Sequence, residues 1–369
     1  MIQTLRDLVR LREEVEDRVR TWVPPEVPLL ELGGRNDFFL ATSSLQKAIR
    51  RNLENEAMTF ASALSRAHER YLAWRLSVIA LEDVGHGDVG LVEKALLIAS
   101  DAGPKEQLGV ERALIWLAGQ LAAAPGNRAA CELVVAASGH PGLRDDLIRM
   151  RGEADLVSAL TATLGPPADA IRIAASIAEL DRRGGLGEGL AAIAPLVGRR
   201  VVWIAETAHD IGVHGLEHGF LASGLLFHGH VPEVVEAALD TARIGPWLAP
   251  ALDQYTRAGL RAIERFAVRC QPIATLLRAV PQRARTGTAA ALVFGAEGGL
   301  LSRRVAYPAS AALTRWCSEA SLASAGAPVQ LLDEGVAVVQ SNLALLHEFR
   351  VEVLPDRWRN LGPGDPEWK

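Results

Sequence analysis

Residues 71–88, YLAWRLSVIALEDVGHGD, decide the fold of this 369-residue chain. Read as a helix to about Asp83, they place apolar side chains on nearly every face at spacings of three and four residues. A helix that is apolar nearly all round is a buried one, so this segment predicts the centre of a helical bundle. Gly85 and Gly87 then end the helix, and Asp88 is placed to cap the next one.

Two acids, Glu82 and Asp83, fall in the last turn of that helix. The helix dipole disfavours a carboxylate there by roughly a few tenths of a kcal/mol, and such a break of a local rule often marks a site or a buried polar partner. We predict a structural polar site in which an acid accepts hydrogen bonds from Arg75 of a neighbouring subunit, or from backbone amides that open the next helix. An acid pair for metal binding or proton transfer is the alternative.

The chain around this helix predicts a compact helical bundle over residues 41–140. Further helices are expected over residues 56–68, 90–100, 106–124 and 128–138. The breaks between them are short and contain glycine or proline, which suits neighbouring antiparallel helices. The first helix of the bundle is expected to begin at a capping box formed by Ser43 and Gln46.

That first helix carries three basic residues, Lys47, Arg50 and Arg51, within about one turn. Leu45 and Ile49 are expected to face inward, which puts the basic turn on the outside. One interpretation is a contact to the phosphate backbone of DNA or to a partner protein. The other is a solvated helix face.

Four segments resemble the C-terminal helical region of the replication-associated recombination ATPases, the MgsA/RarA family, which are relatives of clamp loaders. They are SLQKAIRR at 44–51, WRL at 74–76 with IALEDVG at 79–85 and Asp88, ALIWLAGQLAAAPGN at 113–127, and LDQYTRAG at 252–259. The fourth segment has Tyr255 where the family usually has His. The resemblance implies a domain like a clamp-loader collar over about residues 41–140.

In that family this region holds subunits together as an oligomer. The resemblance therefore implies a scaffold or assembly role near DNA replication, recombination or repair, with a homo-oligomer, an AAA+ ATPase and DNA as candidate partners. Members carry an ATPase module before the region, whereas forty residues precede it here, and the sequence has no Gly-x-x-x-x-Gly-Lys-Ser/Thr loop. We expect neither nucleotide hydrolysis nor a bound cofactor.

The composition is that of a globular protein, since 49% of the residues are hydrophobic and 22% are charged. A net charge of −5 argues against a general polyanion binder and leaves room for a local basic face. Cys131, Cys270 and Cys317 lie far apart, which predicts buried thiols in a reducing compartment. No apolar run approaches the ~18–20 residues that span a bilayer, so we expect a soluble cytoplasmic protein with no membrane contact.

Residues 1–40 are expected to form an N-terminal amphipathic helix and a loop. Leucine and valine keep helical spacing over residues 2–22, with dense charge on the opposite face. This pattern predicts either a helix laid on the body of the protein or a short coiled-coil arm to a partner.

Residues 141–350 predict a second all-α region of stacked helices, in one or two subdomains. Helices are expected there over 143–150, 154–164, 168–181, 189–197, 201–211, 231–242, 249–270, 271–279, 308–323 and 329–349. Residues 350–354 are a strand candidate, and residues 351–369 predict an extended tail.

A dense cluster of ligand-type residues runs from His209 to His218, HDIGVHGLEH. On a helix, Asp210, His214 and either Glu217 or His218 share one face, and imidazole with carboxylate suits zinc or another transition metal. The fragment HDIG is similar to the metal-binding step of HD-type phosphohydrolases. The glycines of this stretch oppose a regular helix and favour the alternative, a polar helix junction whose histidines bond backbone or solvent.

Three functions remain open. The first is a non-catalytic helical scaffold or oligomerisation protein associated with DNA replication, recombination or repair. The second is a metal-dependent phosphohydrolase built on the histidine cluster, and the third is a protein-interaction solenoid unrelated to DNA. Metal content and salt-dependent DNA binding distinguish them.

Overall fold

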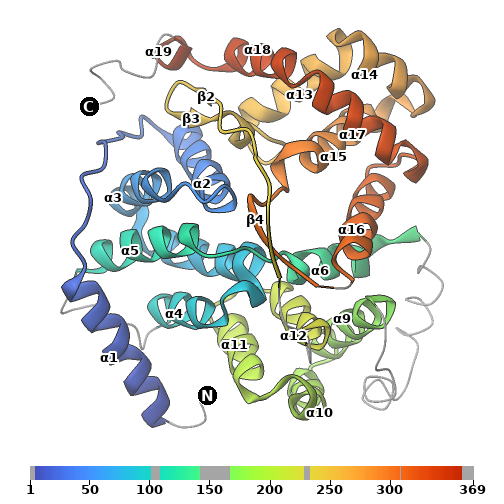
Figure 1. The fold of residues 1–369 in the computed structure, drawn as a ribbon. Helices are drawn as coiled ribbons and strands as arrows, with labels where there is room; N and C mark the ends of the chain where they lie inside the picture. The colour runs from blue at the N-terminus through green and yellow to red at the C-terminus, as the bar shows by residue number, and fades with distance from the viewer. Residues whose placement is uncertain (1–4, 101–108, 142–166, 228–232, 308, 360–369) are drawn as a thin grey trace.

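The computed structural model describes residues 5–100, 109–141, 167–227, 233–307 and 309–359. Over these residues the fold is all-α, as the sequence predicts, with a few short strands (Figure 1). The first helices are α1 (Leu5–Thr21), α2 (Arg35–Arg50), α3 (Glu54–Ile79), α4 (Val89–Ala99), α5 (Val110–Ala123) and α6 (Ala129–Gly139). They are followed by α9 (Pro167–Arg182), α10 (Leu186–Val197), α11 (Arg199–Asp210) and α12 (Leu216–Leu226).

The C-terminal part contains the remaining elements. Its helices are α13 (Arg257–Arg269), α14 (Gln271–Leu276), α15 (Arg285–Val293), α16 (Ser310–Ser324), α17 (Leu332–Ser341), α18 (Leu343–Val353) and α19 (Asp356–Arg359). Two antiparallel strand pairs join β1 (Glu233–Glu236) to β4 (Arg303–Ala306) and β2 (Arg243–Ile244) to β3 (Trp247–Leu248).

Two apolar cores hold these helices together. The first joins α2 to α6 with α9 to α12 and takes in Trp247 and Leu248 of β3. It therefore contains residues from both sides of position 140. The second core is formed mainly by α13 to α18, which lie together at the upper right of Figure 1.

The segment expected to be the central helix forms the second half of α3. His68 departs from helical geometry (φ −164°, ψ 84°), so α3 is kinked between the two helices that the sequence predicts. Beyond the kink, Leu76 and Ile79 are fully buried. A π-helical turn, Ala80–Val84, follows α3, and the buried position of this segment is confirmed.

α2 begins at Arg35, well before the predicted capping box. Asp37 lies in its first turn, where negative charge is favoured, and Asp37 Oδ2 accepts a hydrogen bond from the Gly33 backbone N–H at 2.8 Å. Ser43 is consequently buried in the middle of the helix. The prediction that the helix starts at Ser43 is wrong, because a stronger start signal precedes it.

The expected helix over 231–242 is also wrong. Residues 233–236 form β1, and Glu233 and Glu236 lie opposite Ala306 and Arg303 of β4. The adjacent β-branched residues Val234 and Val235 favour a strand over a helix.

The strand candidate at 350–354 instead belongs largely to α18. Arg350 is fully buried there and Phe349 joins the second core, so tertiary packing overrides the local preference. The tail begins as the short helix α19, and Trp358 packs edge-on against Trp247 with ring centroids 5.5 Å apart.

Helix α12 was not predicted, because the glycines of this stretch, Gly219 among them, oppose a regular helix. Gly219 allows close packing of α12 on α6, since a Cβ there would lie 2.1 Å from the Ala130 carbonyl oxygen. The helices expected over 143–150 and 154–164 lie outside the described residues. None of the helices in the described ranges is long and apolar enough to cross a membrane.

Candidate functional site

The basic turn of α2 is buried. Lys47, Arg50 and Arg51 are 1%, 2% and 4% exposed, so the prediction that they face outward is wrong. The reason is that residues 240–302 cover this side of α2 and supply a partner to each of the three side chains. They are therefore not an accessible surface for DNA.

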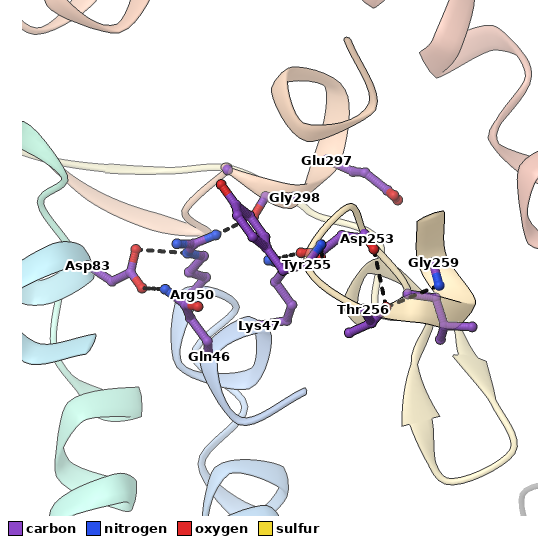
Figure 2. A network of polar contacts seen from close by, with 12 residues as sticks. Gln46, Lys47, Arg50, Asp83, Asp253, Tyr255, Thr256, Gly259, Glu297 and Gly298 are labelled. Carbon is purple, nitrogen blue, oxygen red and sulfur yellow. Dashed lines mark hydrogen bonds and ion pairs between the residues drawn. The ribbon is translucent and has the colours of Figure 1, made fainter. Parts of the chain in front are cut away.

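Arg50 is the centre of a buried ion cluster (Figure 2). Its Nε donates to Asp83 Oδ1 and its Nη2 to Glu82 Oε1, each at 2.8 Å, and its Nη1 donates to the Gly298 carbonyl at 2.6 Å. Both acids come from the π-helical turn after α3, a local geometry that is frequent at functional sites. Each guanidinium nitrogen of Arg50 thus has a partner, as a buried charge requires.

Gln46 connects Arg75 to the same acids. Gln46 Nε2 donates to Asp83 Oδ2 at 2.7 Å and to Glu82 Oε2 at 3.0 Å, while its Oε1 accepts from Arg75 Nη2 at 2.6 Å. The predicted polar residues Arg75, Glu82 and Asp83 therefore lie together within one chain. Their link runs through Gln46, and the direct donor to the acids is Arg50.

The start of α6 closes the cluster from the other side. Arg128 Nε lies 3.3 Å from Asp83 Oδ1, and Arg128 Nη1 donates to the Gly299 carbonyl at 2.8 Å. The Asn127 backbone N–H donates to the Asp83 carbonyl at 2.8 Å. The Pro-x-Asn turn before α6 is thereby bonded to the acidic turn.

Lys47 forms a second buried ion pair, with Nζ 2.7 Å from Asp253 Oδ2. Asp253 lies in a loop that the sequence placed inside a continuous helix over 249–270. That prediction is wrong: α13 begins only at residue 257, capped by Thr256, whose hydroxyl accepts from the Gly259 N–H at 3.1 Å (Figure 2). The cap breaks the helix and leaves Asp253 in the loop that faces α2.

Glu297 anchors a third buried pair and comes from a second π-helical turn, Phe294–Gly298. Arg350 Nη2 donates to Glu297 Oε1, and Arg350 Nε donates to the Leu252 carbonyl at 3.1 Å. Arg51 Nη2 donates to the Glu297 carbonyl at 3.0 Å. These bonds join α2, α18 and the loop before α13.

We call these side chains together the polar centre. It comprises Gln46, Lys47, Arg50, Arg51, Arg75, Glu82, Asp83, Arg128, Asp253, Glu297 and Arg350. The ring of Phe294 lies in its middle, with the cationic groups of Lys47, Arg50 and Arg128 at 5.5, 5.6 and 5.3 Å from its centroid. Tyr255 approaches the same ring edge-on at 6.0 Å.

Burial and ion pairing compete in setting the protonation of this centre. Burial alone would raise the pKa of Glu82, and the guanidinium groups of Arg50, Arg128 and Arg75 lower it to about 2. Burial lowers the pKa of Lys47 to about 8, although the neighbouring carboxylate opposes this shift. The two groups are thus held in opposite charge states at neutral pH.

The thiol beside Glu82 belongs to Cys131. Its Sγ lies 3.7 Å from Glu82 Oε1, and burial together with the carboxylate raises the pKa of Cys131 well above its usual range. The thiolate is the nucleophilic form. Cys131 is therefore an inert thiol here.

Two cavities, of about 370 and 300 Å³, flank the polar centre and share Glu82 and Tyr255 as lining residues. Cys131 and Thr314 line the larger cavity, and Arg75 lines the smaller one. Tyr255 is 70% exposed, so an aromatic ring marks the solvent side of an otherwise buried cluster.

The histidine cluster is broken into two helices. α11 ends at Asp210 and α12 begins at Leu216, so the predicted single helical face does not exist. His209 Nδ1 lies 3.4 Å from Glu217 Oε1, and His214 offers a third ligand atom within 4.8 Å of these two groups. Asp210 is exposed and belongs to neither of the ligand triads found at this junction.

The second triad at this junction consists of Asp181, Glu217 and His218. His218 Nε2 lies 3.3 Å from Asp181 Oδ2 and 3.4 Å from Glu217 Oε1. Asp181 comes from α9, which the sequence gave no reason to place here. Of the predicted ligand residues, His214, Glu217 and His218 each join a triad and Asp210 does not, while Asp181 is added by the fold.

A row of arginines lies on the outer face of α13. Arg257, Arg261, Arg265 and Arg269 are all exposed. Arg265 Nη1 and Arg269 Nη1 donate to Glu352 Oε2 at 2.8 and 3.2 Å. Arg257 and Arg261 have no carboxylate partner within the residues that the structure describes. Their spacing of four residues was visible in the sequence and was missed.

Sequence reasoning also missed several members of the polar centre. Glu297 stands among apolar and glycine neighbours, in FGAEGG, and a lone charge in such a context indicates a buried, paired side chain. Arg350 gave no such signal, because Glu348 and Glu352 lie two positions away on either side. Asp253 gave a weaker signal, because its partner Lys47 is distant in the sequence.

No protein-family model, no curated protein and no solved structure matches the chain. Membership of the MgsA/RarA family stays a prediction. The four segments that carry the resemblance meet at one place, since they contribute Arg50, Asp83, Asn127 and Asp253 to the polar centre and the turn bonded to it.

Proposed function

We propose that the chain is a helical scaffold that binds DNA through the exposed arginines of α13. The observation that carries the proposal is the row Arg257, Arg261, Arg265 and Arg269. The charged side chains of the polar centre bond one another, Gln46 or backbone carbonyls inside the protein, so their role in this proposal is architectural. The proposed DNA contact is therefore α13, and it takes the place of the basic turn of α2 that the sequence predicts and the fold buries.

The geometry of α13 supports an extended contact. Its inner face is apolar, with Ile263 and Phe266 fully buried in the second core. A step of four residues advances about 6 Å along a helix and turns by about 40°. Over three such steps the four arginines advance about 18 Å and turn by about 120° around the solvent side of α13. This extended band matches a backbone of repeated phosphates better than a single charged group.

Charge also supports the proposal. The protein carries a net charge of −5, so four exposed arginines on one helix are a local feature. Arg257 and Arg261 lack a carboxylate partner in the described chain and would exchange only solvent for phosphate. The planar guanidinium binds phosphate in a bidentate manner.

The polar centre supports the scaffold half of the proposal. The Lys47–Asp253 pair ties the loop that precedes α13 to α2, and Arg350 ties the same loop to α18. These bonds fix where α13 begins. We expect this arrangement to hold α13 in a fixed position on the body of the protein. A homo-oligomer, an AAA+ ATPase partner and a cytoplasmic location stay predictions.

Salt-dependent DNA binding tests the proposal. Fluorescence anisotropy with a short single strand and a short duplex, between about 50 and 200 mM salt, gives the slope of log K against log salt. Each lost phosphate contact changes that slope by about 0.9 on duplex DNA. We expect the double variant Arg257→Glu/Arg261→Glu to bind at least ~10-fold more weakly, with a slope smaller by about 2.

The matched control is Arg10→Glu/Arg20→Glu. Both residues are exposed on α1, which lies at the opposite end of the molecule from α13 (Figure 1), and the change in net charge is the same. Equal weakening in both variants would mean a general charge effect. Unchanged binding in the α13 variant would remove the proposal.

A further inference from the structure

The turn between α11 and α12 gathers three metal-ligand groups from a short stretch of chain. His209 lies in the last turn of α11, His214 in the connecting turn and Glu217 in the first turn of α12. Gly212 and Gly215 have positive φ values of 79° and 92°, a conformation that glycine adopts without strain. The two glycines let the chain reverse so that the three side chains converge.

Glu217 is the unusual member of the group. Its side chain is 1% exposed, and its Oε2 has no hydrogen-bond partner among the described residues. The side chains that contact it there are His209 at 3.4 Å and His218 at 3.4 Å, and neither Lys nor Arg pairs with it. A buried carboxylate with an unpartnered oxygen is costly, and a bound cation would remove that cost.

The other two ligands give an ion access from solvent. His214 is exposed and the His209 side chain is 34% exposed. Their rings lie at 73° with centroids 5.0 Å apart, and one ligand atom from each of the three residues lies within 4.8 Å of the others. Two imidazoles and one carboxylate are a known donor set for zinc, with the fourth position left open.

A second layer positions Glu217. His218 Nε2 lies 3.4 Å from Glu217 Oε1 and 3.3 Å from Asp181 Oδ2, close contacts that lack hydrogen-bond geometry. Histidine and carboxylate partners of this kind orient metal ligands from outside the coordination sphere. His218 also lines a cavity of about 560 Å³ between α6 and α9, so the site borders a space that a small ligand could enter.

We infer that His209, His214 and Glu217 bind one divalent transition-metal ion, with zinc as the best match to the donor set. His218 and Asp181 are positioning residues for Glu217. The site lies on α11 and α12, far from α13 (Figure 1), and is independent of the DNA-binding proposal.

The test uses the purified full-length protein, stripped with a chelator, dialysed and titrated with Zn²⁺, with the bound metal measured by mass spectrometry. We expect about one zinc ion per chain. Glu217→Gln and His214→Asn should each weaken binding at least ~10-fold. Asp210→Asn is the matched control, because it removes a neighbouring exposed acid that belongs to neither triad, and it should bind as the wild type does.

Thermal unfolding separates loss of metal from loss of fold. In chelator, Glu217→Gln should unfold at the same temperature as the wild type or higher, since it removes a buried charge without its ion. Zinc should raise the midpoint of the wild type and of Asp210→Asn and leave that of Glu217→Gln unchanged. A wild-type protein that takes up no zinc, or zinc binding that survives Glu217→Gln or fails in Asp210→Asn, would overturn the inference.

Discussion

Lys47 Nζ lies 2.7 Å from Asp253 Oδ2, and the two side chains are only 1% and 2% exposed. One residue comes from the second helix of the chain and the other from the loop that precedes α13. Two charges removed from water are stable only if they stay paired and hydrogen-bonded. The pair therefore ties α2 to the loop that leads into α13, and it cannot be loosened on one side alone.

Removing one member of this pair should cost more than removing both. Lys47→Met leaves Asp253 buried without its cation, and we expect the free energy of unfolding to fall by about 3–5 kcal/mol. Asp253→Asn keeps the acceptor for the Tyr255 N–H, which lies 3.0 Å from Oδ1. The double variant should therefore be more stable than Lys47→Met. Urea unfolding of both single variants and the double variant measures this, and additive losses would show that the two charges do not interact.

The polar centre should make the protein sensitive to acid. Burial raises the pKa of Glu82, but the guanidinium groups of Arg50, Arg128 and Arg75 outweigh it and hold that pKa at about 2, below the value of 4.5 that the group has when unfolded. The unfolded chain therefore binds more protons between pH 4.5 and 2, so stability that is present above pH 4.5 is lost as the pH falls through this window.

Glu82→Gln isolates this effect. The variant should be less stable at pH 7, and its deficit should shrink by about 3 kcal/mol as the pH falls from 5 to 2. Chemical unfolding at several pH values measures the difference. Glu13→Gln, an exposed acid of α1, controls for net charge. A deficit that stays constant with pH would contradict the assigned role of the carboxylate.

The turn after the acids depends on a close backbone approach. A Cβ on Gly87 would lie 2.2 Å from the Pro125 carbonyl oxygen, beside the Asn127 N–H that bonds the Asp83 carbonyl. Gly87→Ala should lower the free energy of unfolding by about 3 kcal/mol, because neither backbone can move without breaking that bond. Gly187→Ala on α10, where nothing lies within 4 Å, should be neutral or stabilising. Thermal unfolding compares the two, and equal effects would mean that the contact is not tight.

The positions of the helices can be predicted from the sequence better than the elements that pack around them. The period of apolar residues predicted α4, α5, α6, α9 and α11 to within a few residues, because local spacing decides which face of a helix is buried. It also singled out Glu82 and Asp83, since acids at a helix end break a local rule. Both features can be recognised within a short stretch of sequence.

The partners of those acids could not be found in the same way. The sequence predicts that Arg50 faces solvent because Leu45 and Ile49 occupy the inward face of the helix, and in a two-layer bundle the rest of the helix surface is exposed. The fold adds a third layer over it, formed by Gly298 and its neighbours. Burial of a charged face depends on chain that is distant in sequence, and periodicity carries no information about such contacts.

Tyr255 offers a test that separates single-stranded from duplex DNA. The residue is 70% exposed and lies two positions before Arg257, so a strand held by the arginine row would pass near its ring. Stacking of a base on an exposed aromatic ring contributes about 1–3 kcal/mol, and bases in a duplex are not free to stack on it. We expect Tyr255→Leu to weaken binding of a single strand by about 5- to 150-fold and to leave duplex affinity unchanged.

Tyr255→Phe should retain single-strand affinity, because stacking needs the ring and not the hydroxyl. Anisotropy titrations at one fixed salt concentration compare the three proteins. Since Tyr255 also touches Phe294 in the polar centre, the unfolding midpoint of Tyr255→Leu must match that of the wild type for the binding result to count. If single-strand and duplex binding weaken equally, the ring supports the position of α13 instead of contacting a base.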